Sequence, residues 1–351
     1  MMLRKKRILV VDDSAVIRRY LIKLLEDAGY EVKSAKNGQE ALEKLEQFSF
    51  SLVTLDIEMP VLDGIATLKE IMKRKPMRVL MISSFTKENA DVTLEALELG
   101  ALDYIPKPKS SLDIVKISNE ILYKVKSALT IIPQQIKHNT ALLKEHKNKI
   151  DSNIDMGFVL IGASTGGPRL IEQICKNLPQ DYPHAVCVVQ HMPTEFTANF
   201  AKRLNSLSKV EVLEADNGLE LKRARVIIAK GGKHLHIRRK LKTFSTLLAP
   251  NTRDRFFIPS VDEMFFSALG VLPIKQVLAV ELTGIGDDGA DGMVALKKAG
   301  AYTIAESEKT AVVYGMPKEA AVRGGASKVL DFNDIVDEII RYGQKNRLDN
   351  R

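Results

Sequence analysis

Side chains suited to cation binding and phosphoryl transfer follow several apolar runs in the first third of the chain. They are Asp12, Asp13, Asp56, Ser83 and Lys107. Short apolar runs are typical of buried strands, and in open α/β sheets ligand groups gather at the carboxyl ends of the strands. Carboxylates meeting there would bind a hard divalent cation such as Mg²⁺. Asp56 could then accept a phosphoryl group, and Lys107 and the Ser83 hydroxyl would bind its oxygens. A single aspartate is more simply a helix cap, but the whole set indicates a site.

A second set of side chains, Ser164, His191 and Asp288, suits acyl transfer. At Gly162–Pro168 an apolar run enters a tight glycine turn, which could cradle a phosphate or project Ser164 as a nucleophile. The turn alone leaves both readings open. A serine hydroxyl needs a base to take its proton, and His191 and Asp288 follow two later apolar runs, where a base and an orienting acid would stand. The three residues together favour a serine hydrolase.

Apolar runs and amphipathic segments alternate over the first 127 residues, which indicates a doubly wound parallel sheet covered by helices. The runs are Ile8–Val11, Leu52–Leu55, Val79–Ile82 and a weaker one around Tyr104–Ile105. Apolar residues at helical spacing predict helices over 14–28 and 111–128. Ser14 is the expected N-cap of the first helix, and Gly29 its stop.

The alternation stops between about Lys126 and Asp155, where prolines, glutamines, lysines and asparagines indicate a linker. It restarts beyond this stretch, which predicts a second α/β domain. Its apolar runs are Phe158–Ile161, Ala185–Val189, Val226–Ala229 and Val277–Val280. We therefore predict domains over residues 1–127 and 154–347, with a linker over 128–153.

A β-hairpin is expected to decorate the second domain. Lys233–Arg238 alternates in polarity directly after Gly231 and Gly232. His234 and His236 lie on this segment, and at such a spacing core or surface histidines are more common than metal ligands.

Composition excludes several classes of protein. Of the 351 residues, 45% are hydrophobic and 27% charged, as in a soluble globular protein, and no apolar run approaches the length of about 18 residues that a membrane span needs. The two cysteines, Cys175 and Cys187, suit a reducing compartment, so we expect a cytoplasmic protein without membrane insertion. The net charge of +8 is concentrated at the N-terminus and in the linker, so the domains themselves are near neutral and nucleic-acid binding is not indicated.

Residues 5–127 resemble the response-regulator receiver family. The matching stretches are Val10–Ser14, Leu55–Pro60 with Asp63-Gly64, Ser83-Ser84 and Tyr104–Pro108. The resemblance implies a flavodoxin-like fold in which Asp56 is the phosphoacceptor and Asp12 and Asp13 carry Mg²⁺ together with Asp56. It also implies that Ser83 is the switch hydroxyl, that Tyr104 reorients with it, and that Lys107 contacts the phosphoryl group.

Residues from about Ile154 to Arg341 resemble the catalytic domain of the chemotaxis protein-glutamate methylesterases. The matching stretches are Ile161–Pro168, Val189–Pro193 with Phe196-Thr197, Pro259–Asp262, Leu282–Gly289 and Tyr314–Pro317. The resemblance implies an α/β hydrolase-type domain in which Ser164 attacks the ester, His191 is the general base and Asp288 orients it. Thr165 would support the site, and the backbone amide of Ile285 is a candidate oxyanion donor.

Departures from the family's pattern concern the rim of the site. Ile285 stands where the family usually has methionine, and Lys230 lies in an Ala-Lys-Gly-Gly stretch that is usually Ala-Pro-Gly-Gly.

The two resemblances together imply phosphorylation-activated hydrolysis of glutamate methyl esters on chemoreceptors, and deamidation of specific glutamines. A chemotaxis histidine kinase would be the phosphodonor, Mg²⁺ would bind the receiver, the esterase would need no cofactor, and the chain would be a monomer. One alternative is a phosphorylation-dependent docking module without catalysis. A DNA-binding regulator is disfavoured because the second domain is near neutral and has no recognition-helix pattern.

Overall fold

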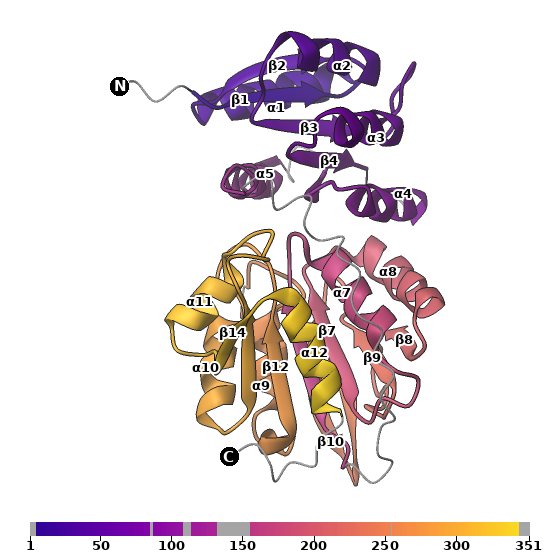
Figure 1. The fold of residues 1–351 in the computed structure, drawn as a ribbon, viewed down its shortest axis with the longest axis vertical. Helices are drawn as coiled ribbons and strands as arrows, with labels where there is room; N and C mark the ends of the chain where they lie inside the picture. Colours follow the sequence, from indigo (N-terminus) through magenta and orange to yellow (C-terminus); the bar gives the residue numbers. More distant parts are fainter. Residues whose placement is uncertain (1–4, 85–86, 108–113, 132–154, 254, 344–351) are drawn as a thin grey trace. The chain divides into compact units, whose positions relative to one another are not determined.

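The structure is a computed structural model that describes residues 5–84, 87–107, 114–131, 155–253 and 255–343. These residues form two compact units, one up to residue 131 and the other from residue 155 on (Figure 1). Most of the predicted linker, residues 132–153, lies outside the described residues. No helix within the described ranges is long and apolar enough to cross a membrane.

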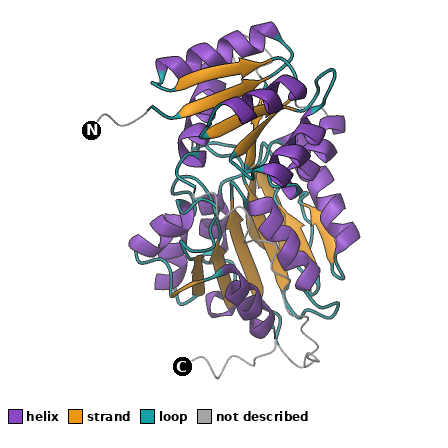
Figure 2. Cartoon of the chain, turned by 45° about the horizontal axis from the view of Figure 1, so that its top comes forward, coloured by secondary structure: helices purple, strands orange, loops and turns teal. Residues whose placement is uncertain are grey.

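The first unit alternates strands and helices along the chain. Its elements are β1 (Arg7–Val11), α1 (Ala15–Asp27), β2 (Glu31–Ala35), α2 (Gly38–Gln47), β3 (Leu52–Asp56), α3 (Gly64–Arg74), β4 (Val79–Ser83), α4 (Lys87–Glu98), β5 (Asp103–Pro106) and α5 (Ile114–Ala128). The strands form one parallel sheet in the order β2-β1-β3-β4-β5. Helices cover the sheet, as Figure 2 shows, so the predicted doubly wound α/β fold is confirmed.

Burial explains why the apolar runs predict these strands. All residues of β3 and β4 are buried, and so are the last four of β1, because helices cover both faces of the sheet. Helix α1 buries Leu21 and Leu25, and the Ser14 side chain accepts a hydrogen bond from the Ile17 amide. The predicted N-cap is therefore confirmed. Gly29 follows the helix with φ +88°, a left-handed conformation that favours glycine.

The start of the predicted linker packs with the first unit. Leu129 and Ile131 are buried, and the Arg78 guanidinium donates to the Ile131 carbonyl at 2.8 Å. Lys6 also donates to the Leu129 carbonyl. Residues 128–131 therefore continue the folded part of the first unit.

The second unit is larger and also contains a parallel sheet. Its elements are β6 (Phe158–Ala163), α7 (Gly167–Asn177), β7 (Ala185–Gln190), α8 (Thr194–Leu207), β8 (Glu211–Glu214), β9 (Arg225–Ile228), β10 (His234–Lys240), β11 (Thr243–Ala249), α9 (Val261–Ala268), the 3-10 helix η1 (Ile274–Gln276), β12 (Val277–Glu281), α10 (Ala290–Lys298), β13 (Tyr302–Glu306), α11 (Met316–Val322), β14 (Lys328–Leu330) and α12 (Phe332–Tyr342). The sheet order is β14-β13-β12-β6-β7-β9-β8, and every pair is parallel.

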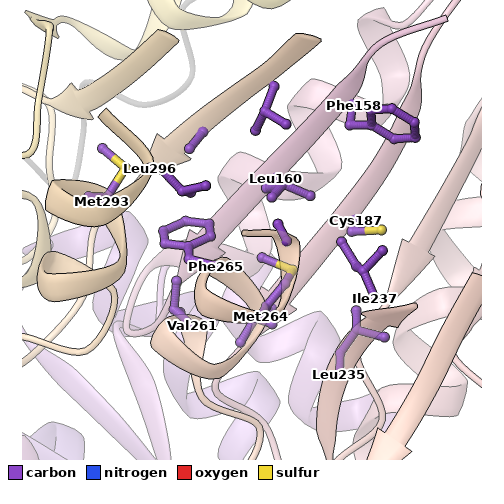
Figure 3. Packing of buried hydrophobic residues seen from close by; sticks show 14 of the residues in the cluster. Phe158, Leu160, Cys187, Leu235, Ile237, Val261, Met264, Phe265, Met293 and Leu296 are labelled. Carbon is purple, nitrogen blue, oxygen red and sulfur yellow. The ribbon is translucent and has the colours of Figure 1, made fainter. Parts of the chain in front are cut away.

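The centre of this sheet is its apolar core. All residues of β6, β7 and β12 are buried. Figure 3 shows Leu160 of β6 in one cluster with Phe265 of α9 and Met293 of α10. The two strands at the ends of the sheet differ, because β8 and β14 are four and three residues long and partly exposed.

Strands β10 and β11 pair antiparallel and form the predicted hairpin. Leu235 and Ile237 of β10 join the core cluster (Figure 3). Phe244 of β11 meets Phe158 edge-to-face, with ring centroids 5.2 Å apart. The hairpin therefore covers the core beside α9 rather than extending the main sheet.

The order of the strands determines where a site can form. In the first unit β1 lies between β2 and β3, and in the second β6 lies between β7 and β12. At such positions the connections leave the sheet in opposite directions, and the loops at the carboxyl ends of the two strands leave a crevice. The candidate residues follow β1 and β3 in one sheet, and β6, β7 and β12 in the other.

Candidate active site

A three-residue turn between β6 and α7 carries Ser164. Gly166 has φ +81°, a left-handed conformation that favours glycine. A Cβ on Gly167, the first residue of α7, would lie 2.2 Å from Gln190 Oε1, so a larger residue would not fit there. The Gly167 amide donates to the Ser164 carbonyl at 2.8 Å. Ser164 is buried at the N-terminal end of α7, where backbone N–H groups favour negative charge.

His191 lies beside this turn because the two strands are in register. Ala163 pairs with Gln190, and the His191 amide donates to the Ala163 carbonyl at 3.0 Å. Ser164 and His191 are thus the first residues beyond a matched pair on neighbouring strands. The buried Gln190 side chain donates to the Ser164 carbonyl at 2.9 Å and to the His191 carbonyl at 3.2 Å, which joins the two backbones.

The His191 ring is hydrogen-bonded to Asp288. Its Nε2 lies 2.8 Å from Asp288 Oδ2, and both side chains are largely buried. The other ring nitrogen, Nδ1, is buried and has no hydrogen-bond partner among the described residues. No hydrogen bond joins the Ser164 hydroxyl to the ring within the part of the chain that the structure describes. The arrangement leaves Nδ1 as the ring atom available to accept a proton.

Asp288 is held at the N-terminus of α9. Its carboxylate accepts hydrogen bonds from the Ser260 hydroxyl at 2.7 Å and from the amides of Val261 at 2.7 Å and Asp262 at 3.2 Å. Burial would raise the pKa of Asp288, but the bond and charge of His191, with the bonds from Ser260 and Val261, outweigh it and hold the pKa below its usual value. Asp288 therefore remains ionised beside the imidazole.

The neighbouring acid, Asp287, points elsewhere. Its Oδ2 lies 2.5 Å from Arg323, which also binds Asp291 and Glu319 on the surface. Asp288, and not Asp287, is thus the acid that meets His191.

The loop that carries Asp288 also packs directly on Ser164. The Ser164 amide donates to the Thr283 carbonyl at 2.9 Å, and a Cβ on Gly284 would come within 2.9 Å of Ser164 Cβ. The Thr283 hydroxyl donates to the Thr165 carbonyl, so Thr165 braces the two loops. Ile285 is buried, and its amide makes no hydrogen bond to the described residues.

Two contributors to this site were not predicted from the sequence. Ser260 lies in the Pro259–Asp262 motif, but its bond to Asp288 depends on the packing of α9 against the loop. The Phe257 ring stacks on the His191 ring, with centroids 4.1 Å apart and an interplanar angle of 8°. Sequence offers no signal for this contact, because the two residues are 66 positions apart in the chain.

Two buried carboxyl groups lie at the ends of the strands beneath this loop. Glu281 is fully buried, with both oxygens unpartnered among the described residues, and burial raises its pKa well above the usual value. Glu306 is also fully buried and accepts a hydrogen bond from the Thr283 amide at 2.8 Å. Burial raises the pKa of Glu306 to about 7.

Lys230 precedes a glycine that approaches the backbone after His191. This lysine follows β9 and lies 3.6 Å from Glu214. The next residue, Gly231, donates to the Thr197 hydroxyl, and a Cβ on it would lie 2.4 Å from the backbone after His191. Gly231 therefore allows two loops to approach closely. His234 and His236 of the hairpin bind Asn251 and Glu263 respectively.

The candidate site of the first unit brings its acids together. Ligand atoms of Asp12, Asp13 and Asp56 lie within 4.8 Å of one another, with Asp12 and Asp56 buried and Asp13 exposed. Lys107 Nζ lies 2.7 Å from Asp56 Oδ2 and 3.2 Å from Asp12 Oδ2. Burial, opposed by Lys107 and reinforced by Asp12, raises the pKa of Asp56 to about 6.

This acidic group fits Mg²⁺. All of its donors are carboxylate oxygens, which this ion prefers. Asp12 Oδ2 is buried without a hydrogen bond to the described residues, although it is within ion-pair distance of Lys107. This oxygen would be free to bind the cation directly.

The remaining candidate residues of the first unit lie on the next two strands. Ser83 ends β4, is fully buried, and its hydroxyl lies 3.1 Å from the Thr93 hydroxyl. Tyr104 is buried on β5, and Lys124 lies over its ring and donates to its carbonyl at 2.7 Å. Residue 108 of the predicted Lys107-Pro108 pair lies outside the described residues.

The fold and the two candidate sites are typical of one class of protein: a two-domain response regulator whose second domain is an enzyme with an α/β fold. Two family models match the chain, the response regulator receiver domain over residues 8–119 and the CheB methylesterase over residues 159–339. The crystal structure of the Thermotoga maritima CheB methylesterase catalytic domain is similar at a TM-score of 0.51 and 38% identity, covering 54% of this chain and 99% of that one.

Relatives match over nearly the whole chain. A protein-glutamate methylesterase/protein-glutamine glutaminase 2 of Carboxydothermus hydrogenoformans is 44% identical over 348 residues, 96% of this chain and 98% of the relative. A protein-glutamate methylesterase/protein-glutamine glutaminase of Archaeoglobus fulgidus is 42% identical over 343 residues, 96% and 97% of the two chains. The chain therefore belongs to the CheB methylesterase family, with a response regulator receiver domain preceding the catalytic domain. The resemblance found in the sequence and the assignment as a carboxylic ester hydrolase are confirmed.

Proposed function

We propose that this chain hydrolyses glutamate methyl esters on chemoreceptors with Ser164, His191 and Asp288 as its catalytic triad. One observation carries the proposal. His191 binds Asp288 through Nε2 and keeps Nδ1 unpartnered among the described residues, while Ser164 occupies the adjoining strand end. Apo hydrolases often lack a short serine–histidine bond, which tightens when substrate binds.

The first half of the reaction forms an acyl-enzyme. The Ser164 hydroxyl attacks the ester carbonyl while His191 Nδ1 takes the hydroxyl proton. Asp288 stabilises the resulting imidazolium through Nε2. The tetrahedral intermediate then breaks its bond to the methoxy group, which leaves as methanol with the proton from Nδ1.

The second half regenerates the enzyme. A water molecule loses a proton to Nδ1 and attacks the glutamyl–serine ester, and the proton returns to Ser164 as the glutamate leaves. Ionised Asp288 serves both halves, since its low pKa keeps it charged while the histidine carries a proton. An amide can follow the same route with ammonia as the leaving group, so glutamine deamidation is the second expected activity.

Backbone amides would bind the oxyanion of each tetrahedral intermediate. The Ile285 amide has no hydrogen-bond partner among the described residues and belongs to the loop that packs on Ser164. Ser164 also lies at the N-terminal end of α7, whose dipole favours negative charge. Such donors contribute strongly because they are aligned before the charge develops.

The receiver would control the esterase through Asp56. A chemotaxis histidine kinase is the expected phosphodonor, and Lys107 and Ser83 would bind the new phosphoryl oxygens. Mg²⁺, held by Asp12, Asp13 and Asp56, would offset the charge of the phosphoryl group during transfer. We propose that the unphosphorylated receiver restrains the Ser164 site and that phosphorylation weakens this restraint.

Replacement of Ser164 by alanine tests the proposed function. With methylated chemoreceptor membranes as substrate, Ser164→Ala is expected to lower the release of volatile methanol by at least about a thousandfold, because the nucleophile is lost. Ser206→Ala, an exposed serine on α8, is the matched control and should release methanol at the wild-type rate.

The same variant separates the enzyme from a docking module without catalysis. A docking module would release methanol neither before nor after the substitution, and its signalling would survive Ser164→Ala. Methanol release at the wild-type rate by Ser164→Ala would refute the proposed nucleophile.

A further inference from the structure

The Phe257 ring covers one face of the His191 imidazole almost flat. The ring planes differ by 8° and the centroids are 4.1 Å apart. Phe256 meets Phe257 edge-to-face, with centroids 4.9 Å apart at 86°. Phe256 is 56% exposed to solvent, so Phe257 lies between this outer ring and the histidine.

The segment that carries Phe257 is fixed on its N-terminal side. The Arg255 amide donates to Asn251 Oδ1 at 2.9 Å, and Asn251 Nδ2 donates to the Arg255 carbonyl at 3.1 Å. Arg255 Nε lies 3.3 Å from Glu263 Oε1, and Arg255 Nη1 lies 3.5 Å from Asp262 Oδ2, both on α9. These contacts set the position of the backbone two residues before Phe257.

The segment is fixed on its C-terminal side by the residues that hold Asp288. The Ser260 amide donates to His234 Nδ1 at 3.1 Å, and His234 Nε2 lies 3.2 Å from Asn251 Oδ1. One buried histidine of the hairpin therefore ties both ends of the segment together. The Ser260 hydroxyl in turn binds Asp288, the partner of His191.

The His191 ring is thus restrained along separate directions. Asp288 binds Nε2 at the ring edge, and Phe257 packs on the ring face. A hydrogen bond at one edge leaves the ring free to tilt about that bond, whereas a stacked ring opposes this tilt. An aromatic face close to a cation also stabilises it, and the imidazolium exists only after His191 has accepted the serine proton.

We infer that Phe257 is a positioning residue for catalysis, which keeps His191 Nδ1 aimed at Ser164 and favours the cation that proton transfer creates. This inference rests on the proposed role of His191 as the general base. The segment before α9 would thus contribute to the chemical step through Phe257.

The test compares two replacements of Phe257 in the full-length chain. Phe257→Leu keeps an apolar side chain but removes the flat face, and is expected to lower kcat by about three- to tenfold, the range of aromatic-pair energies, with KM changed less than about twofold. Phe257→Tyr restores the flat face and should keep kcat within about twofold of wild type. Both constants are measured from methanol release by methylated chemoreceptor membranes.

Histidine NMR reports the tautomer of His191, which would not change if Phe257 only stabilised the fold. The chain has six histidines, so ¹⁵N-histidine labelling gives few signals, and loss of one signal in His191→Gln identifies His191. Wild type and Phe257→Tyr are expected to show one tautomer with the proton on Nε2. Phe257→Leu is expected to show a broadened or averaged pair of ring nitrogen signals.

Phe256→Leu is the matched control, because it removes a ring one position away without uncovering His191. It should leave kcat and the His191 signals unchanged. Equal losses in Phe256→Leu and Phe257→Leu would overturn the inference, as would a Phe257→Leu enzyme with wild-type kcat and a single tautomer. A His191→Gln chain that retains wild-type kcat would instead refute the proposed function itself.

Discussion

Asp288 makes more hydrogen bonds than its contact with His191 requires. The Ser260 hydroxyl and the amides of Val261 and Asp262 occupy the rest of its acceptor capacity. These bonds fix the carboxylate, and the carboxylate fixes the tautomer of the imidazole. Residues outside the proposed triad would therefore fix its geometry, as partners of metal ligands do in metal sites.

Ser260 provides a test of this argument at the scale of one hydroxyl. Ser260→Ala removes a bond to a charged carboxylate and the cap of α9, so we expect kcat to fall about tenfold and stability to fall by about 1 kcal/mol. Methanol release and urea unfolding measure the two effects. Ser260→Thr keeps the hydroxyl and should restore both. If Ser260→Ala lost stability but kept kcat, Ser260 would be a helix cap and nothing more.

At the scale of elements, the end of β13 carries an unusual group for a buried strand. Glu306 is fully buried at the last position of β13, next to β12 and its loop. Its pKa is raised from 4.5 to about 7 by burial, so the folded chain retains a proton that the unfolded chain releases. The contribution of Glu306 to the free energy of unfolding is therefore fully present at low pH, decreases as pH rises from about 4.5 to about 7, and is level above that range.

Glu306→Gln should remove this dependence, because the amide stays neutral and can still accept the bond from Thr283. From the pKa shift of Glu306, the substitution should raise the free energy of unfolding by about 3 kcal/mol at most at pH 8, and by much less at pH 5. We expect the calorimetric transition of the catalytic domain to rise by about 5 °C at pH 8 and to change little at pH 5. Glu308→Gln, at an exposed position nearby, is the control. An equal change at both pH values would contradict the assigned protonation of Glu306.

The long buried strands and most of the chemistry at their ends could be predicted from the sequence. β3, β6, β7 and β12 are apolar on both faces, and their continuous runs mark them directly. The short end strands β8 and β14 could not be found this way, because partial exposure breaks the apolar pattern. β13 could not be found either, because only Ile304 and Ala305 form an apolar run between Thr303 and Glu306.

The residues of the candidate site could likewise be predicted only in part. Ser164, His191 and Asp288 could be predicted because each follows a recognisable strand or glycine turn. Phe257 could not, since nothing local distinguishes an aromatic residue that stacks on a distant histidine from one in the core. Ser260 was visible as part of a motif, but its partner became evident only once α9 and the loop of Asp288 were seen together.

At the scale of the whole molecule, two folded units with separate sites share one chain. Each carries its residues at the carboxyl edge of its own sheet. A receiver can change the activity of a hydrolase only if phosphorylation interacts differently with the restrained and released arrangements. We expect phosphorylation to change the rate of ester hydrolysis by about 5- to 100-fold.

A comparison of the full-length chain with residues 150–351 tests the proposed control. A small-molecule phosphodonor is expected to raise methanol release by the full-length chain and to leave the fragment unaffected. Asp56→Asn, which cannot accept the phosphoryl group, should stay at the low rate with the phosphodonor present. The fragment is a reasonable unit, because the Thermotoga maritima catalytic domain has a crystal structure of its own. Equal rates in the full-length chain, with or without phosphodonor, and the fragment would rule out control by the receiver.

The brevity of the strands at the two ends of the seven-stranded sheet has a consequence for solubility. An end strand exposes N–H and C=O groups that can pair with a strand of another molecule. β8 and β14 offer four and three residues, and they carry Glu211, Glu214 and Lys328. A neighbouring molecule would gain few main-chain bonds there and would meet charged side chains. Edge-to-edge pairing is therefore disfavoured at both ends of this sheet.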